Sequence, residues 1–565
     1  MHVEEKTDTV HLDSVHAEDA PIDDYRVGWH TFLAILSLAI ANCCATLSNT
    51  TNTTIRFQVQ SVGGAQNASW IANGNFLLTL ACGPIFGSLS DRLGKKWFIV
   101  VGGAIGVIGS FVSSSADHVG VIIAGNILTG IANAGCITSV AANQEIMPNK
   151  LRPYAFGFAQ TVNSIAAIAG TFTAAAFVKY ASWRWSYRLN GIVYAISALA
   201  VLATYFPPPT AIRRTGELGK ILMSVDYVGI LLLTGSFASL LIGLTWGGST
   251  YAWSSGVIIG TLVAGCVGLV ICGLFEWLVK KENALFDHRL FETANFSILA
   301  LVCLIDGMLL LGVNVLFAQE IADLFTQDSV KIASVLAPFL VTSTIGCLPA
   351  GYIMGKTKSF KILLIVALTI CALFTGLMAL VNQDRKPMAE GFSAVFGIGT
   401  AVTTVIPIVA LGLSVPSFLL GTAGTLSISA RALGGITGVT IFTAIYDNKI
   451  AVNLPKEVGA VVMANGGNAE LIKGVIGALM SPAPPPVALQ QVPGLSPKLI
   501  GPILAANTVA SAESWKFVWV AIACITFAGA ILTCFVSSVK GRMTEHVESA
   551  LEKSATRDSQ FTSKR

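Results

Sequence analysis

Two charged side chains stand inside long apolar stretches of this 565-residue sequence. Asp306 lies in the middle of the run from Leu301 to Leu311, and Arg431 lies in a second run further along the chain. Burying either charge in a lipid bilayer costs about 3 kcal/mol or more, so such residues face a protein interior or a watery cavity. Asp306 could bind a proton or a cationic group of a ligand, and Arg431 is the second candidate. The alternative for both is a purely structural role.

Amide side chains recur in other apolar stretches. Asn126 and Asn133 lie two helical turns apart and therefore share one face of their helix. We predict that this pair lines a central cavity and hydrogen-bonds an oxygenated ligand. Hydrogen bonding between helices is the alternative.

A short charged turn, Gly87 to Lys96, joins two apolar runs that carry no charge, Trp70 to Phe86 and Trp97 to Ser115. Glycines permit a sharp backbone turn. Asp91 can meet a helix N-terminus or pair with a basic group, and so hold a gate closed until it moves. An ordinary basic loop is the alternative. The residues of this predicted gate loop are Gly87, Asp91, Arg92, Gly94, Lys95 and Lys96.

The elements that carry these residues are long and apolar. The chain is 53% hydrophobic and 12% charged, whereas about 25% of the residues of soluble proteins are charged. Because a membrane-spanning helix needs about 20 mostly apolar residues, we predict an all-α integral membrane protein with about fourteen spans. The predicted spans lie near 30–48, 70–89, 97–116, 119–140, 155–177, 188–206, 227–246, 255–276, 294–316, 331–354, 361–381, 392–413, 418–446 and 515–538.

The predicted spans group as six, two and six. The turn from Gly351 to Lys361 repeats the glycine and basic residues of the gate loop at the matching place in the second six, and repeated halves are typical of transporters. The predicted parts are a disordered tail at 1–26, a six-helix bundle at 27–206, a linker with two extra spans at 207–293, a second six-helix bundle at 294–538 that includes an outer loop at 447–514, and a tail at 539–565.

Basic residues set the predicted orientation. If the N-terminus is cytoplasmic, the short loops on that side carry most of the lysines and arginines, which is the positive-inside pattern. These loops carry Arg92, Lys95, Lys96, Lys150, Arg152, Arg213, Arg214, Lys220, Lys280, Lys281, Arg289, Lys356, Lys358 and Lys361. We therefore predict that both termini are cytoplasmic.

Three glycosylation sequons fall in the first predicted outer loop, at Asn49, Asn52 and Asn67. Single sequons recur by chance. Three in one short loop, on the side that the charges assign to the outside, predict a glycoprotein that follows the secretory route of a eukaryote.

Enzyme and metal chemistry have little support in the sequence. The 11 cysteines lie in predicted spans, and no Cys-x-x-Cys or Cys/His cluster has the spacing of metal ligands. Gly355-Lys356-Thr357 resembles the end of a phosphate-binding loop, but Ala350 stands where that loop needs its first glycine. We expect no enzyme activity, no cofactor, no metal and no nucleic-acid partner.

The gate loop, with Leu89 added, resembles the loop signature of the major facilitator superfamily. Other segments resemble its fourteen-span branch, and within that branch the fungal trichothecene efflux pump family. Fungal siderophore transporters look similar over much the same range of residues. The segments that carry the resemblance are Ser69–Leu78, Pro148–Pro153, Ser182–Trp185, Asp226–Leu233, Leu244–Trp253 and Ser427–Gly435. The likeness covers residues 27–545.

The resemblance implies a major facilitator fold, in which two six-helix bundles rock about a central site, with two additional spans. It implies a monomeric secondary active transporter in the plasma membrane, with the vacuolar membrane as the alternative. The implied cargo is a hydrophobic small molecule, such as a fungal secondary metabolite, toxin or drug, and the implied coupling ion is the proton. A siderophore–iron importer and a transporter-like nutrient sensor are the alternative functions.

Two motifs of the related proton-coupled drug antiporters differ in this chain. Those proteins carry an arginine in the fourth span, where this chain has Asn126. They also carry a Gly-Pro-x-x-Gly-Gly element in the fifth span, where this chain has Gly170-Thr171. Proton antiport is therefore implied by the family and not by these two motifs.

Overall fold

The computed structural model describes residues 28–64, 68–207, 226–248, 251–278, 290, 294–415, 419–465, 468–479 and 485–537. The predicted tails, most of the connections within the 207–293 linker and the sequon at Asn67 lie outside these residues. So do several predicted orientation markers, namely Arg213, Arg214, Lys220, Lys280, Lys281 and Arg289.

The first half of the chain forms a helical bundle. It contains α1 (Trp29–Thr51), the 3-10 turn η2 (Asn52–Thr54), α2 (Ile55–Val62), α3 (Ala68–Leu93), α4 (Lys95–Ser114), α5 (Val119–Glu145), α6 (Arg152–Tyr180) and α7 (Arg184–Thr204). Helix α4 packs along α5 and α7, and α1 packs along α6. Glycines line the α4 side of these contacts: a Cβ atom at Gly109 would lie 2.8 Å from the carbonyl oxygen of Gly125 on α5.

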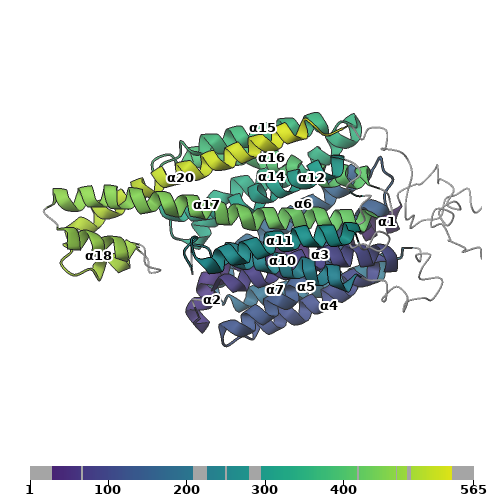
Figure 1. The fold of residues 1–565 in the computed structure, drawn as a ribbon, viewed down its shortest axis with the longest axis horizontal. Helices are drawn as coiled ribbons and strands as arrows, with labels where there is room; N and C mark the ends of the chain where they lie inside the picture. Colours follow the sequence, from purple (N-terminus) through teal and green to yellow (C-terminus); the bar gives the residue numbers. More distant parts are fainter. Residues whose placement is uncertain are drawn as a thin grey trace, which may run out of the picture.

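The second half forms another bundle, which holds the largest apolar core of the described residues. It contains α12 (Ala294–Gly307), the π-helical turn η5 (Met308–Gly312), α13 (Val313–Leu324), α14 (Ser329–Thr357), α15 (Lys361–Met378), α16 (Lys386–Ser414), α17 (Leu420–Ala464) and α20 (Pro497–Thr533). The two bundles are joined along their length, because α14 packs along α6 and α17 packs along α3 (Figure 1).

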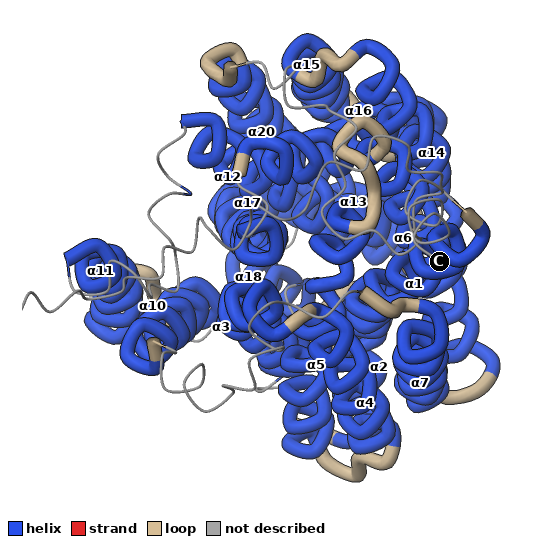
Figure 2. Tube along the Cα trace, turned by 90° about the vertical axis from the view of Figure 1, so that its right-hand side faces the viewer, coloured by secondary structure: helices blue, strands red, loops and turns tan. Residues whose placement is uncertain are grey.

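Two further helices, α10 (Tyr227–Trp246) and α11 (Gly256–Leu278), pack on each other at the outside of the molecule (Figure 2). Helix α10 packs along α3, and Cys272 of α11 belongs to the same apolar cluster. Helix α11 exposes a run of apolar side chains, including Val263 and Val270. An all-apolar exposed face suits contact with lipid. This pair corresponds to the two extra spans predicted in the linker.

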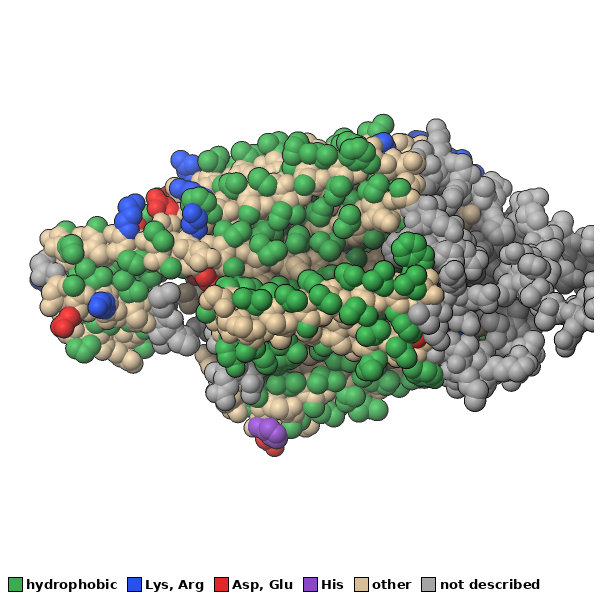
Figure 3. All heavy atoms as spheres, viewed as in Figure 1, with side chains coloured by type: hydrophobic (Ala, Val, Ile, Leu, Met, Phe, Trp, Pro, Cys, Tyr) green, Lys and Arg blue, Asp and Glu red, His purple; other side chains and the backbone are tan. Residues whose placement is uncertain are grey.

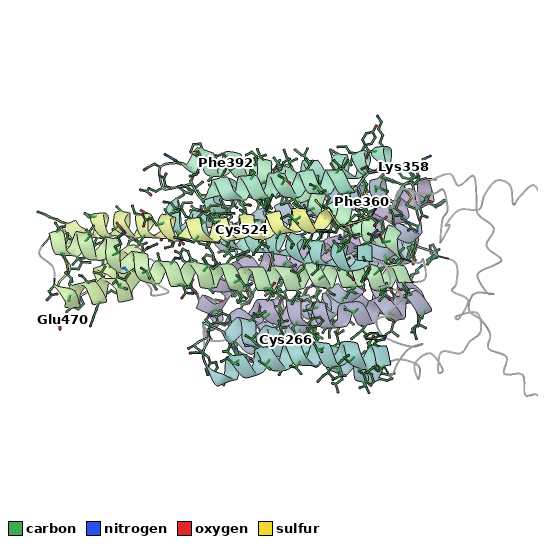
Figure 4. All side chains as sticks on the ribbon, turned by 45° about the horizontal axis from the view of Figure 1, so that its top comes forward. Cys266, Lys358, Phe360, Phe392, Glu470 and Cys524 are labelled. Atoms are coloured by element: carbon green, nitrogen blue, oxygen red, sulfur yellow. The ribbon has the colours of Figure 1, made fainter. Side chains whose placement is uncertain are left out.

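Thirteen helices within the described residues are long and apolar enough to cross a membrane. Helix α3 is not among them, yet it is 26 residues long and packs along α5 and α17, so it takes the place of the second predicted span. Apolar side chains cover the body of the molecule in Figure 3. Figure 4 shows two exposed cysteines on this body, Cys266 on α11 and Cys524 on α20.

The segment predicted as an outer loop, 447–514, is mostly helical in its described part, and the helices of the last two predicted spans continue into it. Helix α17 continues past 446 to Ala464, and α20 begins at Pro497 rather than near 515. Between them lie α18 (Ala469–Leu479) and α19 (Pro485–Gln490). All four helices share an apolar core that includes Val458, Val475 and Ile503.

We call the described part of residues 447–510 the cap. It projects beyond the bundles, with Glu470 near its tip, while Lys358 lies at the opposite end of the molecule (Figure 4). The two ends are named the cap end and the gate end below. The cap is helical because Leu454, Val458 and Val462 recur every fourth residue and give α17 a continuous apolar face.

Helices α12 and α17 cross in very close contact. A Cβ atom at Gly434 would lie 1.9 Å from the carbonyl oxygen of Leu304, and one at Gly307 would lie 1.9 Å from the carbonyl oxygen of Arg431. Each helix therefore presents a glycine to the backbone of the other. This crossing sets where the charged residues of the two helices meet.

Substitution of Gly434 by alanine should force α12 and α17 apart. Because overpacking a tight contact costs about 1–3 kcal/mol, we expect a lower midpoint of thermal unfolding for the purified protein in detergent. Gly235→Ala on α10 is the matched control, since nothing lies within 4 Å of a Cβ atom there. Equal midpoints for the two variants would show that the crossing tolerates a side chain.

Candidate functional site

The two charged residues singled out in the sequence form an ion pair in the second bundle. Arg431 Nε on α17 lies 2.8 Å from Asp306 Oδ2 on α12. The Asp306 side chain is completely buried and the Arg431 side chain is 11% exposed. The crossing at Gly307 and Gly434 brings the backbones close enough for this contact. A buried charge that has an opposite charge beside it avoids most of the cost of an isolated one.

Helix α16 completes the surroundings of the pair. Thr403 Oγ1 donates a hydrogen bond to Asp306 Oδ1 at 2.6 Å, and Thr404 Oγ1 donates a longer one at 3.4 Å. The guanidinium of Arg431 also donates to the carbonyl oxygen of Thr404 at 3.0 Å. Three helices are thus held through one carboxylate and one guanidinium. A change in the charge of Asp306 would act on all three.

The predicted gate loop is mostly helix. Helix α3 continues to Leu93, and α4 begins at Lys95. Only Gly94 lies between them, with a φ of 92° that side chains other than glycine rarely adopt. Gly87 serves a different purpose from the turn we predicted: it is helical, and a Cβ atom there would lie 2.0 Å from Thr425 Oγ1 on α17. It allows α3 to approach α17.

Asp91 lies at the N-terminus of α17, one of the two contacts predicted for it, and its role as a gate residue stays a prediction. Its Oδ1 accepts from the backbone N–H of Gly421 at 2.8 Å, and its Oδ2 accepts from the backbone N–H of Thr422 at 2.8 Å and from Thr422 Oγ1 at 3.0 Å. A carboxylate satisfies the free N–H groups of a helix N-terminus and interacts favourably with its dipole. We call this set of bonds the gate contact, and it joins the two bundles.

Lys95 lies beside the gate contact and was predicted as part of the loop. Its ammonium group is 2.9 Å from Asp91 Oδ1 and also forms an ion pair with Glu145 on α5. Glu145 was missed in the sequence because the fourth span was expected to end near 140. Its position two residues before Met147-Pro148, where the apolar run has ended, was the available signal.

The remaining basic residues of the loop serve other contacts. Lys96 Nζ donates to the carbonyl oxygen of Leu202 at 3.0 Å and lies 3.6 Å from the ring centre of Phe206. Arg92 stands in the last turn of α3. The contacts of Lys96 are separate from the gate contact.

Asn126 and Asn133 are both buried on one face of α5, and both contact a tyrosine of α7. Asn126 Nδ2 donates to Tyr187 Oη at 3.0 Å and to the carbonyl oxygen of Ile122 at 2.9 Å. Asn133 accepts from the hydroxyl of Tyr194 and donates to Asn75 Oδ1 at 3.2 Å. Hydrogen bonding between helices, the alternative role, is therefore present for both. Contact with cargo stays a prediction.

The sequons lie at and after the end of α1. Asn49 is half-buried in the last turn of the helix. Both polar atoms of the Asn52 side chain are buried, so a glycan there would require this segment to move. Asn67 lies outside the described residues. Glycosylation stays a prediction.

A second contact joins the two bundles toward the cap end. Lys179 Nζ at the end of α6 lies 3.3 Å from Asp328 Oδ2. Asp328 also accepts from the backbone N–H groups of Val330 and Lys331 at the start of α14. The Val330 hydrogen bond, followed by the bond from Lys179, holds the pKa of Asp328 below its usual value. Exposed ion pairs contribute little, so this contact is weaker than the gate contact.

Comparison with known proteins shows which family this sequence matches. Residues 15–561 match the family described as "Fungal trichothecene efflux pump (TRI12)". The chain is 24% identical to the "MFS-type transporter ucsD" of Acremonium sp over 75% of this chain and 72% of that protein. It is 24% identical to the "Efflux pump aflT" of Aspergillus parasiticus over 77% of this chain and 85% of that protein.

Solved structures confirm the predicted major facilitator fold. The proton:xylose symporter XylE superposes with a TM-score of 0.58 at 13% identity, over 92% of this chain and 98% of that one. The human organic anion transporter MFSD10 superposes with a TM-score of 0.53 at 12% identity, over 88% of this chain and 98% of that one.

Asp91→Ala should expose the first amides of α17. Because the backbone N–H groups of Gly421 and Thr422 lose their acceptor, their hydrogen–deuterium exchange should accelerate, by about tenfold for each 1.4 kcal/mol of lost protection. Mass spectrometry of the peptide around Gly421 measures this. In the matched control, Asp328→Ala, faster exchange should be confined to the start of α14. Unchanged exchange at both amides in Asp91→Ala would show that the gate contact does not protect the start of α17.

Proposed function

Because the chain belongs to the fungal trichothecene efflux pump family of major facilitator transporters, we propose that it exports a hydrophobic small molecule in exchange for protons. The cargo class is a fungal secondary metabolite, toxin or drug. The protein acts as a monomer in the plasma membrane by alternating access. The observation that carries the coupling is the buried ion pair of Asp306 and Arg431.

Protonation of Asp306 provides a physical route from a proton to a movement of helices. The neutral acid no longer attracts Arg431, and an unpaired guanidinium at this depth is costly. The arginine then needs another partner, such as water or a polar cargo group, and α17 moves with it. Because Thr403 and Thr404 hold the same carboxyl group, α16 responds as well. A proton at one atom therefore biases three helices.

The gate contact closes one entrance in this conformation. Alternating access requires the two bundles to separate there, so the hydrogen bonds from Gly421 and Thr422 to Asp91 must break once in each cycle. Two described basic residues that we predicted as cytoplasmic lie at this end: Lys95 pairs with Asp91 at the start of α17, and Lys358 is labelled in Figure 4. This distribution supports a cytoplasmic gate end and a cap outside the cell.

Cells that lack the protein should accumulate its cargo. We expect severalfold more of a labelled hydrophobic metabolite inside null cells, and restoration of the low level when the wild-type protein is expressed. The measurement is retained label after loading a panel of such compounds and one labelled ferric siderophore. Reduced uptake of the siderophore in null cells would favour an importer. Unchanged flux of every compound, with altered nutrient signalling, would favour a sensor.

Asp306→Asn should abolish transport driven by a pH gradient and leave surface expression intact. Asparagine has the same shape and keeps an acceptor for Thr403, while Arg431 keeps the carbonyl oxygen of Thr404. The measurement is export of the compound identified in null cells, at several external pH values, with surface protein quantified in parallel. Wild-type export with wild-type pH dependence would remove Asp306 from the mechanism.

A further inference from the structure

A second group of carboxyl groups lies toward the cap end of the second bundle, on the same transmembrane segment as Asp306. Glu320 and Asp323 stand one helical turn apart on α13 and contact tryptophans of α20. At 1.5 Å per residue, Glu320 lies about 20 Å along the segment from Asp306. The two sites are therefore separate.

Neutral donors surround both side chains. Trp519 Nε1 donates to Glu320 Oε1 at 3.0 Å. Asp323 Oδ2 accepts from Trp515 Nε1 at 3.1 Å and from Tyr446 Oη at 3.0 Å. The rings of Tyr446 and Trp515 are 4.4 Å apart, so the donors are held in place by their own packing.

Glu320 has no cation beside it in the described part of the chain. It is 1% exposed, and its Oε2 atom is buried without a hydrogen-bond partner. This differs from Asp306, which is equally buried but has Arg431 at 2.8 Å. The nearest titratable group that faces Glu320 is Asp323, whose like charge would oppose a second negative charge.

The charged groups on the helices that pack against α13 face elsewhere. Lys331 at the start of α14 and Lys516 on α20 are exposed. Lys449 on α17 lies over the ring of Phe517, 4.0 Å from its centre. Asp447, next to Tyr446, is exposed. None of these four forms an ion pair with Glu320 or Asp323 within the described residues.

These surroundings favour the neutral acid over the carboxylate. An isolated carboxylate in a protein interior costs several kcal/mol, and a single hydrogen bond from an indole offsets only part of that cost. A protonated carboxyl group avoids the charge. A metal cation is a poor alternative occupant, because Na⁺-like and Ca²⁺-like ions need several oxygen ligands. The contact that Glu320 makes within the described residues is with an indole N–H, whose ring packs against Phe317.

We propose that Glu320 is a second proton-binding site of the transporter, loaded in this conformation and reached from the cap end through Asp323. In the loading step the O–H bond of protonated Asp323 breaks and an O–H bond forms on the Glu320 carboxylate. Asp323 becomes the anion, which the hydrogen bonds from Trp515 on α20 and Tyr446 on α17 stabilise. Asp323 is only partly buried, which gives the relay its contact with solvent. This assignment deepens the proposed function and rests on its proton coupling.

The backbone between the two acidic sites supports their separate roles. The π-helical turn η5 interrupts the segment after Asp306, and α13 begins after it. Such turns are frequent at functional sites. Because η5 packs along α17, which also carries Arg431 and Tyr446, the same helix contacts both sites. A proton on Glu320 and one on Asp306 can therefore both act on the packing between the α12–α13 segment and α17.

Infrared spectroscopy of the purified full-length protein in nanodiscs tests the proposal without any cargo. The carbonyl stretch of a protonated carboxylic acid should be present at neutral pH and decline on alkaline titration. Glu320→Gln should lack this band. Trp519→Phe should keep the band but shift its frequency, because the indole donor is lost. Asp306→Asn should leave the band unchanged, since the proposal assigns the band to Glu320 and Asp306 has Arg431 as a charged partner.

Two results would overturn the proposal. One is an unchanged band in Glu320→Gln, which would mean that Glu320 is ionised. The other is loss of the wild-type band on adding NaCl at constant pH, which would identify a cation as the ligand. If Glu320→Gln fails to fold, the frequency shift in Trp519→Phe decides the question, and no shift argues against the site. If the carbonyl band is present but no compound is exported by cells that express the protein, the proton site at Glu320 is retained and the export function is rejected.

Discussion

The cost of placing charge at membrane depth is the constraint on which this structure depends. Each deeply buried charged group that we describe has a partner that reduces this cost: Arg431 for Asp306, and the ammonium of Lys95 together with the α17 amides for Asp91. Within the described residues, Glu320 has only the neutral indole of Trp519 beside it, and protonation is a further way to reduce its cost. Under the proposed proton coupling, ionisable groups with such different partners are candidates for binding protons at different steps.

The contacts between the two halves differ in strength, and this difference has consequences for the transport cycle. At the gate end, a buried carboxylate accepts three hydrogen bonds from the start of α17. Toward the cap end, an exposed lysine meets Asp328. Because the buried contact is the stronger one, this conformation is held mainly at the gate end. Opening that end requires compensation from elsewhere, and binding of cargo or a proton can supply it.

The sequence predicted the fold well, because membrane spans depend on composition, which is local. Asp306, Arg431 and Asp91 were also found, since a charge within an apolar run is conspicuous. The pairing of Asp306 with Arg431 was not predictable, because it depends on a crossing of glycines more than one hundred residues apart. The extent of the helices in the cap was not predictable, because the proline-rich stretch suggested a loop, while these helices are held by a small core of their own. Glu320 escaped notice because it lies near the end of a span, where acidic residues are common.

Helix α17 is 45 residues long and starts at the gate contact, carries Arg431, reaches Asp323 through Tyr446 and ends in the cap. All these contacts depend on the rotational phase of one helix. Inserting a single residue between Arg431 and Tyr446 would turn everything beyond it by about 100° and advance it by about 1.5 Å. The tyrosine would then face away from Asp323, and the cap would be displaced around the axis. Over this stretch a change in the length of the chain would disturb every contact beyond it, whereas a change of residue type outside the glycine crossing would disturb only its own neighbours.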